Sequence, residues 1–227
     1  MTTWLLINAG LLLAAYLLGS LPTGYLAGKL LKGIDLRTEG SGSTGATNVL
    51  RTLGKGPAIV VLLVDILKAV AAIALVRVVY AAPSVLAIAP ATVTPEIWKP
   101  WVIMLAGIMV LIGHSKSVWL GFQGGKSVAS GLGVFLAIAP VVGLLSLAVF
   151  SVVLAVFRIV SLGSIMAAIA GTILMVAFQK PIPYQLIALL GGVYVILRHR
   201  QNIQRLLAGT EPKIGQKLEQ ASSPSQK

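Results

Sequence analysis

The sequence contains no cysteine and few charged residues, and both shortages narrow what the protein can be. Without cysteine there is no disulfide framework, no thiolate nucleophile and no thiolate metal ligand. Charged side chains make up 11% of the 227 residues, whereas a soluble domain has about 25%. Two histidines are too few for a typical zinc site without carboxylate help, so we expect no metal and no other cofactor.

Apolar residues fill the sequence instead and predict an all-α, polytopic membrane protein. Hydrophobic residues make up 57% of the chain, in long runs, and the mean hydropathy is +0.93. The net charge of +12 does not indicate nucleic-acid binding, because the basic residues lie in short loops at the ends of apolar runs. The first run has no basic segment before it and no clear cleavage site, so we expect a retained span and not a signal peptide.

Seven apolar segments are predicted to cross the membrane as helices, with the N-terminus outside and the C-terminus in the cytoplasm. Pro22 should kink the first of them. Residues 132–157 fit one tilted span or two short spans divided between Pro140 and Gly143. Two spans gather most basic residues on one side, as the positive-inside rule favours. The spans are residues 4–28, 57–80, 101–113, the two parts of 132–157, 162–178 and 184–197.

Three polar segments interrupt the apolar sequence, and this topology places all three on the cytoplasmic face. Glycines in each let backbone N–H groups point into one concavity, and hydroxyl, amide and basic side chains add donors for an anion. A flexible polar loop is the alternative reading of one such stretch. Three together indicate a site for a phosphorylated substrate at the membrane surface. The first polar segment is residues 39–51, the second residues 113–131 and the third residues 198–211.

Two look-alike motifs in these segments can be discarded. The GGKS of the second polar segment resembles the end of a P-loop, but the preceding glycine, Gly121, is one residue too close and no βαβ unit surrounds it. A His-x-x-x-x-Asp pair, which serves one large acyltransferase class, is absent because Trp119 and Gln204 occupy the aspartate positions. Because the spans beside the second polar segment are short, we expect this segment to dip into the membrane.

Asp65 and Lys68 lie inside the second predicted span, three residues apart and so on one helical face. Ionisable residues in a span face the bundle interior or a cavity, and function is the default hypothesis for them. The alternative is a pair that neutralises itself and fixes helix packing. Structural alternatives also stand for His114, as an interfacial polar residue, and for Lys126 and Arg198, as positive-inside anchors.

The polar segments together resemble the signature segments of the bacterial acyl-phosphate:glycerol-3-phosphate acyltransferase family. The resemblance extends to about Glu211, which defines one membrane acyltransferase domain, residues 1–211, and a polar, disordered tail, residues 212–227. The chain departs from the family at Ser43, usually Asn, at Lys116 and Ser117, usually Phe-Pro, and at Gln123, usually Lys. The matching stretches are GSGSTGATNVLR, GHSKSVWLGFQGGKSVASGLG and RHRQNIQRLLAGTE, with LGSLPTGYLAGKL, VDILKA and FRIVSLGSI between and before them.

The resemblance implies a seven-span enzyme of the bacterial inner membrane with its active site facing the cytoplasm. It would move a fatty acyl group from acyl phosphate to the 1-hydroxyl of glycerol 3-phosphate, giving lysophosphatidic acid and phosphate. Its partners would be these substrates and membrane lipids, without nucleic acid, and we expect a monomer. His199, Lys126 and Ser41 would be catalytic. The implied substrate-binding residues are Ser41, Asn48, Arg51, His114, Gly124, Gly125, Lys126, Ser164, His199 and Asn202.

The chemistry suits these residue types, because acyl phosphate is already activated and the enzyme mainly has to align two anions. Lys126, Arg51 and backbone N–H groups can neutralise the phosphates and the developing oxyanion. The proton acceptor is either a substrate phosphate oxygen or His199. A transporter of an organic phosphate is the alternative function, although no inverted repeat is visible. A purely structural subunit does not account for three anion-binding segments on one face.

Overall fold

The computed structural model describes residues 1–216, and every secondary-structure element within this range is a helix. The all-α prediction is therefore confirmed for this part of the chain. An isolated bridge between Ser117 and Gln123 closes a short hairpin. The helices are α1 (Thr2–Ser20), α2 (Thr23–Lys32), α3 (Ala46–Thr52), α4 (Lys55–Val79), α5 (Pro83–Ala87), α6 (Pro95–Ser115), the 3-10 turn η1 (Val118–Leu120), α7 (Val128–Ile138), α8 (Pro140–Phe157), α9 (Val160–Ala177), α10 (Ile182–Arg198) and α11 (Arg200–Leu207).

The first predicted span is broken at the proline that was expected to kink it. α1 ends at Ser20 and α2 begins at Thr23, and Leu21 between them has a non-helical ψ of 115°. Pro22 lacks the N–H that would continue the helical hydrogen bonds. The break leaves the Leu21 carbonyl outside a helix, where it accepts a hydrogen bond from the Thr23 N–H at 3.1 Å and one from the Lys68 ammonium at 3.0 Å.

α6 begins at Pro95, earlier than the predicted start at Trp101. Pro100 lies inside the helix, where it removes one backbone hydrogen bond near the helix start without ending the helix. The 21 residues of α6 rise by about 31 Å, so the prediction of a short span was wrong for this helix. α7, with 11 residues, is short. The expectation that the second polar segment dips into the membrane therefore depends on α7 alone.

The division of residues 132–157 into two helical segments is confirmed, whereas two separate membrane spans remain a prediction. α7 ends at Ile138 and α8 starts at Pro140, with Ala139 at φ −150° and ψ 79° between them. Five helical segments in the described chain are long and apolar enough to cross a membrane, and α10 with α11 makes a sixth if this bent pair is one span. These helices confirm the character of a polytopic membrane protein.

The helices pack as a bundle in which neighbours in space are often distant in sequence. α1 packs mainly on α6, α4 on α7, and α9 on both α8 and α10. The core between them includes the fully buried Trp4, Ile73 and Met175. α1 and α6 approach closely at small residues, because a Cβ on Gly113 would come within 2.3 Å of the Tyr16 carbonyl oxygen. Close helix contact of this kind holds the end of α6, where the second polar segment starts.

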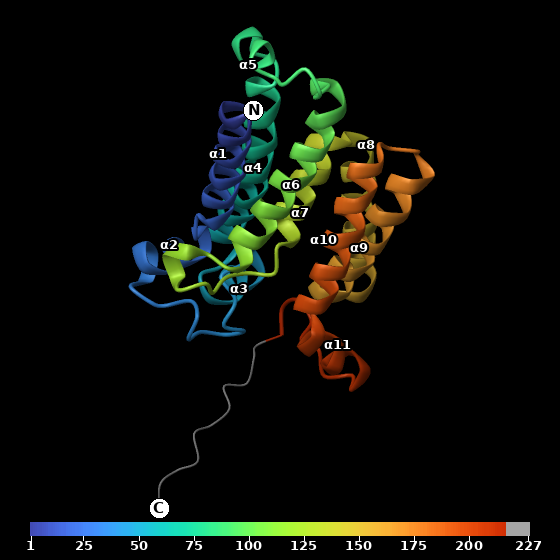
Figure 1. Ribbon diagram of the computed structural model, residues 1–227. Helices are drawn as coiled ribbons and strands as arrows, with labels where there is room; N and C mark the ends of the chain where they lie inside the picture. The colour runs from blue at the N-terminus through green and yellow to red at the C-terminus, as the bar shows by residue number, and fades with distance from the viewer. Residues whose placement is uncertain (217–227) are drawn as a thin grey trace, which may run out of the picture.

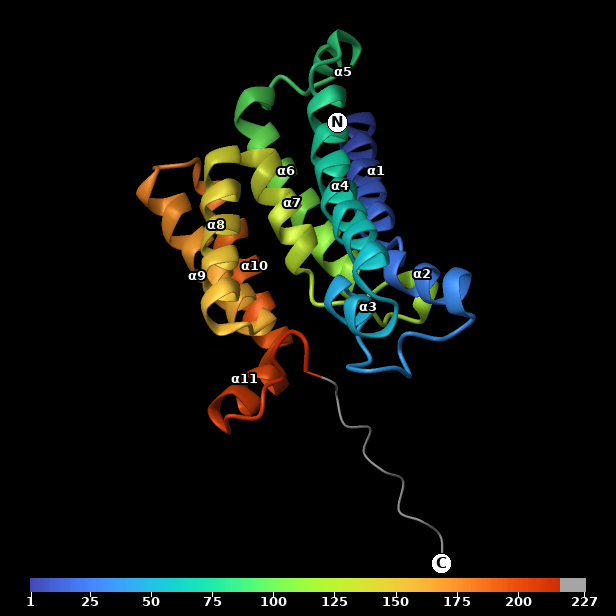
Figure 2. The ribbon, with the colours of Figure 1, turned by 180° about the vertical axis from the view of Figure 1, so that it is seen from behind.

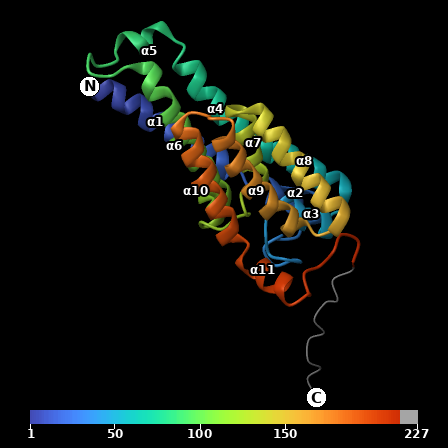
Figure 3. The same cartoon turned by 90° about the vertical axis from the view of Figure 1, so that its right-hand side faces the viewer.

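All three polar segments meet at one end of the bundle, as the topology predicted. In Figure 1 this is the lower end, where α2, α3 and α11 lie, while the N-terminus and α5 lie at the upper end. The view from behind and the view from the side agree (Figures 2 and 3). Two short helices, α3 and α5, lie in stretches predicted as loops. A small core of Leu36, Val49, Ala58 and Val61 fixes α3 against α4.

The third polar segment does not continue α10 in a straight line. α10 and α11 meet at a bend of 61°, with His199 between them. Residues 200–207 of this segment form the short helix α11, with His199 at its N-cap and Asn202 inside it. Of the predicted disordered tail, residues 212–216 are described and Ile214 hydrogen-bonds to Arg158 in both directions. The remainder, residues 217–227, lies outside the described residues.

Candidate active site

Asn48 gives the first polar segment its shape. Its side chain is 1% exposed, and its Nδ2 donates to the carbonyl oxygens of Leu36 at 3.1 Å, Glu39 at 2.9 Å and Ser43 at 2.9 Å. Its Oδ1 accepts from the Ser41 backbone N–H at 2.9 Å. One amide therefore replaces the missing backbone bonds of a glycine-rich loop, and Ser41 is held at the exposed edge of this loop.

Arg51 projects from α3, immediately after this loop. It lies within electrostatic range of Glu211 and Arg205 in the third polar segment, so the first and third segments face each other. Burial lowers the pKa of Arg51, and Glu211 partly offsets this effect. The guanidinium nevertheless stays charged at neutral pH, because arginine is not deprotonated in proteins. Arg51 therefore offers a cation beside the loop that carries Ser41.

The second polar segment folds back on the end of α6. The Gly125 N–H donates to the His114 carbonyl at 3.1 Å, and a Cβ on Gly124 would lie 2.2 Å from that same oxygen. Arg198 holds the segment from the other side, since its Nη2 donates to the Gly125 carbonyl at 3.0 Å. The amide of Gly125 is thus occupied in this structure, which leaves the amide of Gly124 as the candidate donor to an anion.

A chain of hydrogen bonds joins the second and third polar segments. The Lys126 ammonium donates to Asn202 Oδ1. Asn202 Nδ2 in turn donates to Glu211 Oε1 at 2.6 Å, and Ser161 donates to the same oxygen at 2.7 Å. Arg205 Nε donates to Glu211 Oε2 at 2.7 Å. Glu211 therefore orients Asn202, and Asn202 orients Lys126.

Lys126, which begins this hydrogen-bonded chain, has a lowered pKa. Burial lowers the pKa of Lys126 from 10.5 to about 8. Glu211 opposes this shift, while the positive charges of Arg205, Arg51 and Arg198 add to it. Lys126 thus lies among several cations with one carboxylate, an arrangement that attracts a multiply charged anion.

His199 is buried, at 3% exposed, and its tautomer follows from its contact. Nδ1 lies 2.7 Å from the Val195 carbonyl oxygen, and since a carbonyl only accepts, Nδ1 carries the proton. Nε2 therefore has a free lone pair. Burial lowers the pKa of His199 from 6.5 to about 4, so it is a neutral and weak base at pH 7.

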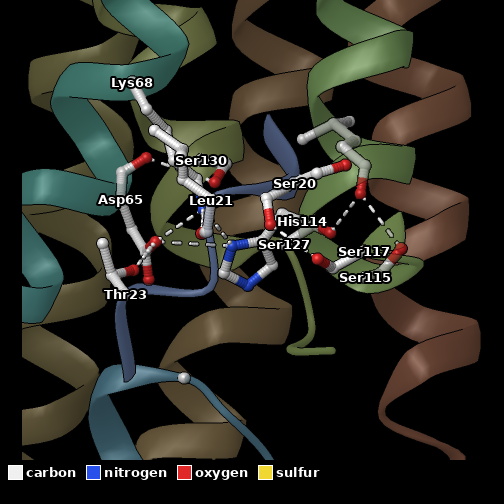
Figure 4. A network of polar contacts seen from close by, with 12 residues as sticks. Ser20, Leu21, Thr23, Asp65, Lys68, His114, Ser115, Ser117, Ser127 and Ser130 are labelled. Atoms are coloured by element: carbon white, nitrogen blue, oxygen red, sulfur yellow. Dashed lines mark hydrogen bonds and ion pairs between the residues drawn. The ribbon is translucent and has the colours of Figure 1, made fainter. Parts of the chain in front are cut away.

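His114 lies in a separate network in which most side chains are buried. Figure 4 shows it between Asp65 and Lys68 of α4 and the serines at the end of α6. Lys68 Nζ lies 2.8 Å from Asp65 Oδ1 and 3.1 Å from His114 Nδ1. Asp65 also accepts a hydrogen bond from Thr23 at 2.6 Å. The ionisable pair predicted to face the bundle interior does so, behind the Gly124–Gly125 stretch.

Ser164 is placed apart from the hydrogen-bonded chain. It is 4% exposed on α9, and its hydroxyl donates to the Val160 carbonyl at 2.9 Å. Its neighbour one turn earlier, Ser161, contacts Glu211 instead. A polar cavity of about 220 Å³ lies beside Gly124, lined by Arg37, Gly42, Ser115, Lys116, Phe122, Gln123, Gly124 and Arg198.

Sequence reasoning predicted that the three polar segments lie together but did not indicate the contacts of Glu211 and Ser161. Glu211 lies nine residues after Asn202 in sequence, with a bend and α11 between, so spacing alone gives no signal. A carboxylate beside Arg205 and among many cations was a weak hint.

Among His, Cys, Asp and Glu residues of the described chain, no group of three or more could hold a metal ion.

Comparisons with known proteins agree on one family. A family model described as glycerol-3-phosphate acyltransferase matches residues 9–209. A glycerol-3-phosphate acyltransferase of Nostoc sp. is 61% identical over 215 residues, which cover 95% of each chain. That of Trichormus variabilis is 60% identical over 218 residues, which cover 96% of each chain.

Solved structures match the fold as well. The crystal structure of PlsY (YgiH), an integral membrane glycerol 3-phosphate acyltransferase, in its glycerol 3-phosphate form aligns with a TM-score of 0.80 and 37% identity. The alignment covers 92% of this chain and 96% of that one. The lysophosphatidic acid form aligns with a TM-score of 0.77 and 36% identity over 92% of this chain and 95% of the other.

Proposed function

Because the chain belongs to the glycerol-3-phosphate acyltransferase family, we propose that it transfers a fatty acyl group to the 1-hydroxyl of glycerol 3-phosphate, with acyl phosphate as the donor. The products are lysophosphatidic acid and phosphate. The observation that carries the proposal is the hydrogen-bonded chain of Lys126, Asn202 and Glu211, which joins two polar segments beside Arg51. Such a cluster of cations, fixed in place by one carboxylate, suits two phosphorylated substrates.

The roles of the residues follow from charge and position. Arg51 and Ser41 bind the phosphate of glycerol 3-phosphate, since a guanidinium grips phosphate through two donors. Lys126 and the Gly124 amide bind the acyl phosphate and stabilise the oxyanion that forms on its carbonyl. Asn48 acts indirectly, because its amide fixes the conformation of the loop that carries Ser41.

The glycerol hydroxyl attacks the acyl carbonyl, the C–O bond to phosphate breaks, and the hydroxyl proton must leave. His199 Nε2 can accept this proton, but its pKa of about 4 makes it a weak base. A phosphate oxygen has a second pKa of about 6 and is the better acceptor. We assign proton acceptance to the substrate phosphate and assign His199, with Asn202, to substrate orientation. Ser164 remains a substrate contact by family position.

The membrane arrangement extends the same proposal. Seven segments cross the bacterial inner membrane: α1 with α2, α4, α6, α7, α8, α9 and α10. The end that carries α3 and α11 then faces the cytoplasm, because it holds most of the basic residues. The acyl chain lies between the helices, open to lipid, in a single domain of residues 1–211. One copy suffices, since every group named above comes from one chain.

The donor is tested by phosphate release from purified protein in lipid. We expect release from palmitoyl phosphate only when glycerol 3-phosphate is present, and no lysophosphatidic acid from palmitoyl-CoA. The thioester carries no phosphate on its carbonyl for Lys126 and Gly124 to hold. Transfer from palmitoyl-CoA at a comparable rate would refute acyl phosphate as the specific donor.

Arg51→Ala should raise KM for glycerol 3-phosphate by about tenfold or more and change kcat much less, because it removes binding common to ground state and transition state. Arg51→Lys should recover only part of the affinity, since a lysine lacks the two-donor fork. The measurement is steady-state kinetics at saturating palmitoyl phosphate. An unchanged KM in Arg51→Ala would remove Arg51 from the glycerol 3-phosphate site.

A further inference from the structure

The Asp65–Lys68 pair has no role in the steps described above, yet it is among the most deeply buried polar groups of the chain. Asp65 is 1% exposed and Lys68 4% exposed. Burying two charges costs several kcal/mol per ion unless their partners are well placed. The partners of Lys68 therefore show what the pair contributes.

Lys68 uses all of its hydrogens on three acceptors. Its Nζ lies 2.8 Å from Asp65 Oδ1, 3.0 Å from the Leu21 carbonyl oxygen and 3.1 Å from His114 Nδ1. An ammonium has three donors and no acceptor. His114 Nδ1 must therefore accept, which means that it carries no proton. Asp65 Oδ1 is farther from Nδ1, at 3.6 Å, than Lys68 is.

The proton of the neutral His114 ring then resides on the other nitrogen, Nε2. This nitrogen faces the second polar segment, because a Cβ on Gly125 would lie 2.2 Å from it. Within the described chain Nε2 makes no hydrogen bond, and it is not completely buried. His114 thus has one ring nitrogen fixed by Lys68 and an N–H free beside the Gly124–Gly125–Lys126 run.

We propose that Lys68, held by Asp65, fixes the tautomer of His114 so that its Nε2–H is a hydrogen-bond donor to the acyl phosphate. The proposal rests on the proposed function, which puts this substrate at the glycine run. Lys68 and Asp65 are positioning residues, since they act through His114. The pair also holds both sides of the site, because Lys68 binds the Leu21 carbonyl at the α1–α2 break and Asp65 binds Thr23 just after it (Figure 4).

The tautomer is measured without any turnover, by nitrogen NMR of protein labelled with ¹⁵N-histidine. The chain has only two histidines, and the structure assigns them opposite tautomers. His114 should show a bare Nδ1 and a protonated Nε2, whereas His199 should show the reverse. His199→Asn identifies the His114 signals. A protonated Nδ1 on His114 at neutral pH would overturn the proposal, whatever the protein's activity.

The catalytic consequence is measured with the double variant Asp65→Asn, Lys68→Met, which leaves no lone buried charge. We expect its kcat/KM for palmitoyl phosphate to fall by about tenfold to a hundredfold, as for a lost or misplaced donor, with a mixture of His114 tautomers. A pair that only neutralises itself predicts wild-type activity in this variant. Arg77→Met, which removes an exposed cation near the other end of α4, is the matched control and should change neither readout.

His114→Gln separates positioning from general damage to the fold. A glutamine places an amide N–H near the position of Nε2 without needing a tautomer, so His114→Gln should keep more activity than His114→Asn. In the His114→Gln background the double change at Asp65 and Lys68 should cost less than about threefold. An equal cost in both backgrounds would show that the pair does not act through His114. If the double variant fails to fold, the His114 tautomer measured in the wild-type protein still tests the proposal.

Discussion

Lys126→Met should lower kcat/KM by about a hundredfold to a thousandfold, the range seen when an enzyme loses one preorganised donor to a developing oxyanion. Lys126 occupies the centre of the cation cluster and links the second and third polar segments through Asn202. Methionine is unbranched and only one atom shorter than lysine, so folding should be preserved. Lys55→Met is the matched control, because Lys55 is exposed at the start of α4 near the same end of the bundle. A loss of the same size in both variants would show that general charge, and not Lys126, is responsible.

The pH profile gives an independent test of the same residue. Since burial lowers the pKa of Lys126 to about 8, the ammonium is present below this pH and is lost as the pH rises through it. A neutral lysine cannot hold an anion, so kcat/KM should fall above about pH 8, and kcat/KM reports the free enzyme. Lys126→Arg should be less active but should move this fall to a higher pH, because arginine stays charged. The same fall in both proteins would assign it to another group.

Glu211→Ala should reduce activity by about a hundredfold and also lower the melting temperature in detergent. The change leaves Ser161, Asn202 and Arg205 without their acceptor, and each buried unpaired donor costs about 1–3 kcal/mol. Burial raises the pKa of Glu211, but the hydrogen bonds from Asn202, Ser161 and Arg205 together lower it by more than burial raises it. The carboxylate is therefore ionised at neutral pH. Asn202 then loses its fixed orientation, and Lys126 loses its partner.

Glu211→Gln separates the effect of losing the hydrogen-bond acceptor from the effect of losing the negative charge. Its remaining carbonyl oxygen can still accept from Asn202, while the charge that opposes the lowered pKa of Lys126 is gone. We expect this variant to be more stable than Glu211→Ala but still impaired, with the alkaline fall in kcat/KM shifted to lower pH. Glu96→Ala, an exposed carboxylate at the start of α6, should leave both readouts unchanged. Wild-type activity in Glu211→Ala would refute the positioning role of this carboxylate.

The breaks in the helices were predictable because each depends on a residue with a strong local effect. Pro22 ends α1, and Pro140 starts α8, in both cases because proline lacks the backbone N–H of a continuing helix. Pro100 is the counterexample, since it lies inside α6, which begins at Pro95 and not at the predicted residue 101. Local sequence shows that a proline is present but not whether the helix has already begun before it.

The site was predictable where chemistry is concentrated in one short segment, and not where it depends on contacts across the bundle. Arg51, Lys126 and Asn202 belong to polar segments that topology alone puts at one end. The hydrogen-bonded chain that orders them runs through Glu211, which spacing does not indicate. The amide of Asn48 turns inward to its own loop, a direction that a list of polar residues cannot reveal. The role of Asp65 and Lys68 likewise requires the position of His114 on another helix.

The central claim, that the polar segments form one site for acyl transfer to glycerol 3-phosphate, is tested most directly by product stoichiometry. Purified protein in sealed lipid vesicles would receive palmitoyl phosphate and ¹³C-labelled glycerol 3-phosphate, with lysophosphatidic acid and phosphate both measured over time. We expect one labelled lysophosphatidic acid for each phosphate released, and neither product when one substrate is omitted. Folded protein that moves labelled glycerol 3-phosphate into the vesicles unchanged, without forming either product, would contradict the account and indicate a transporter.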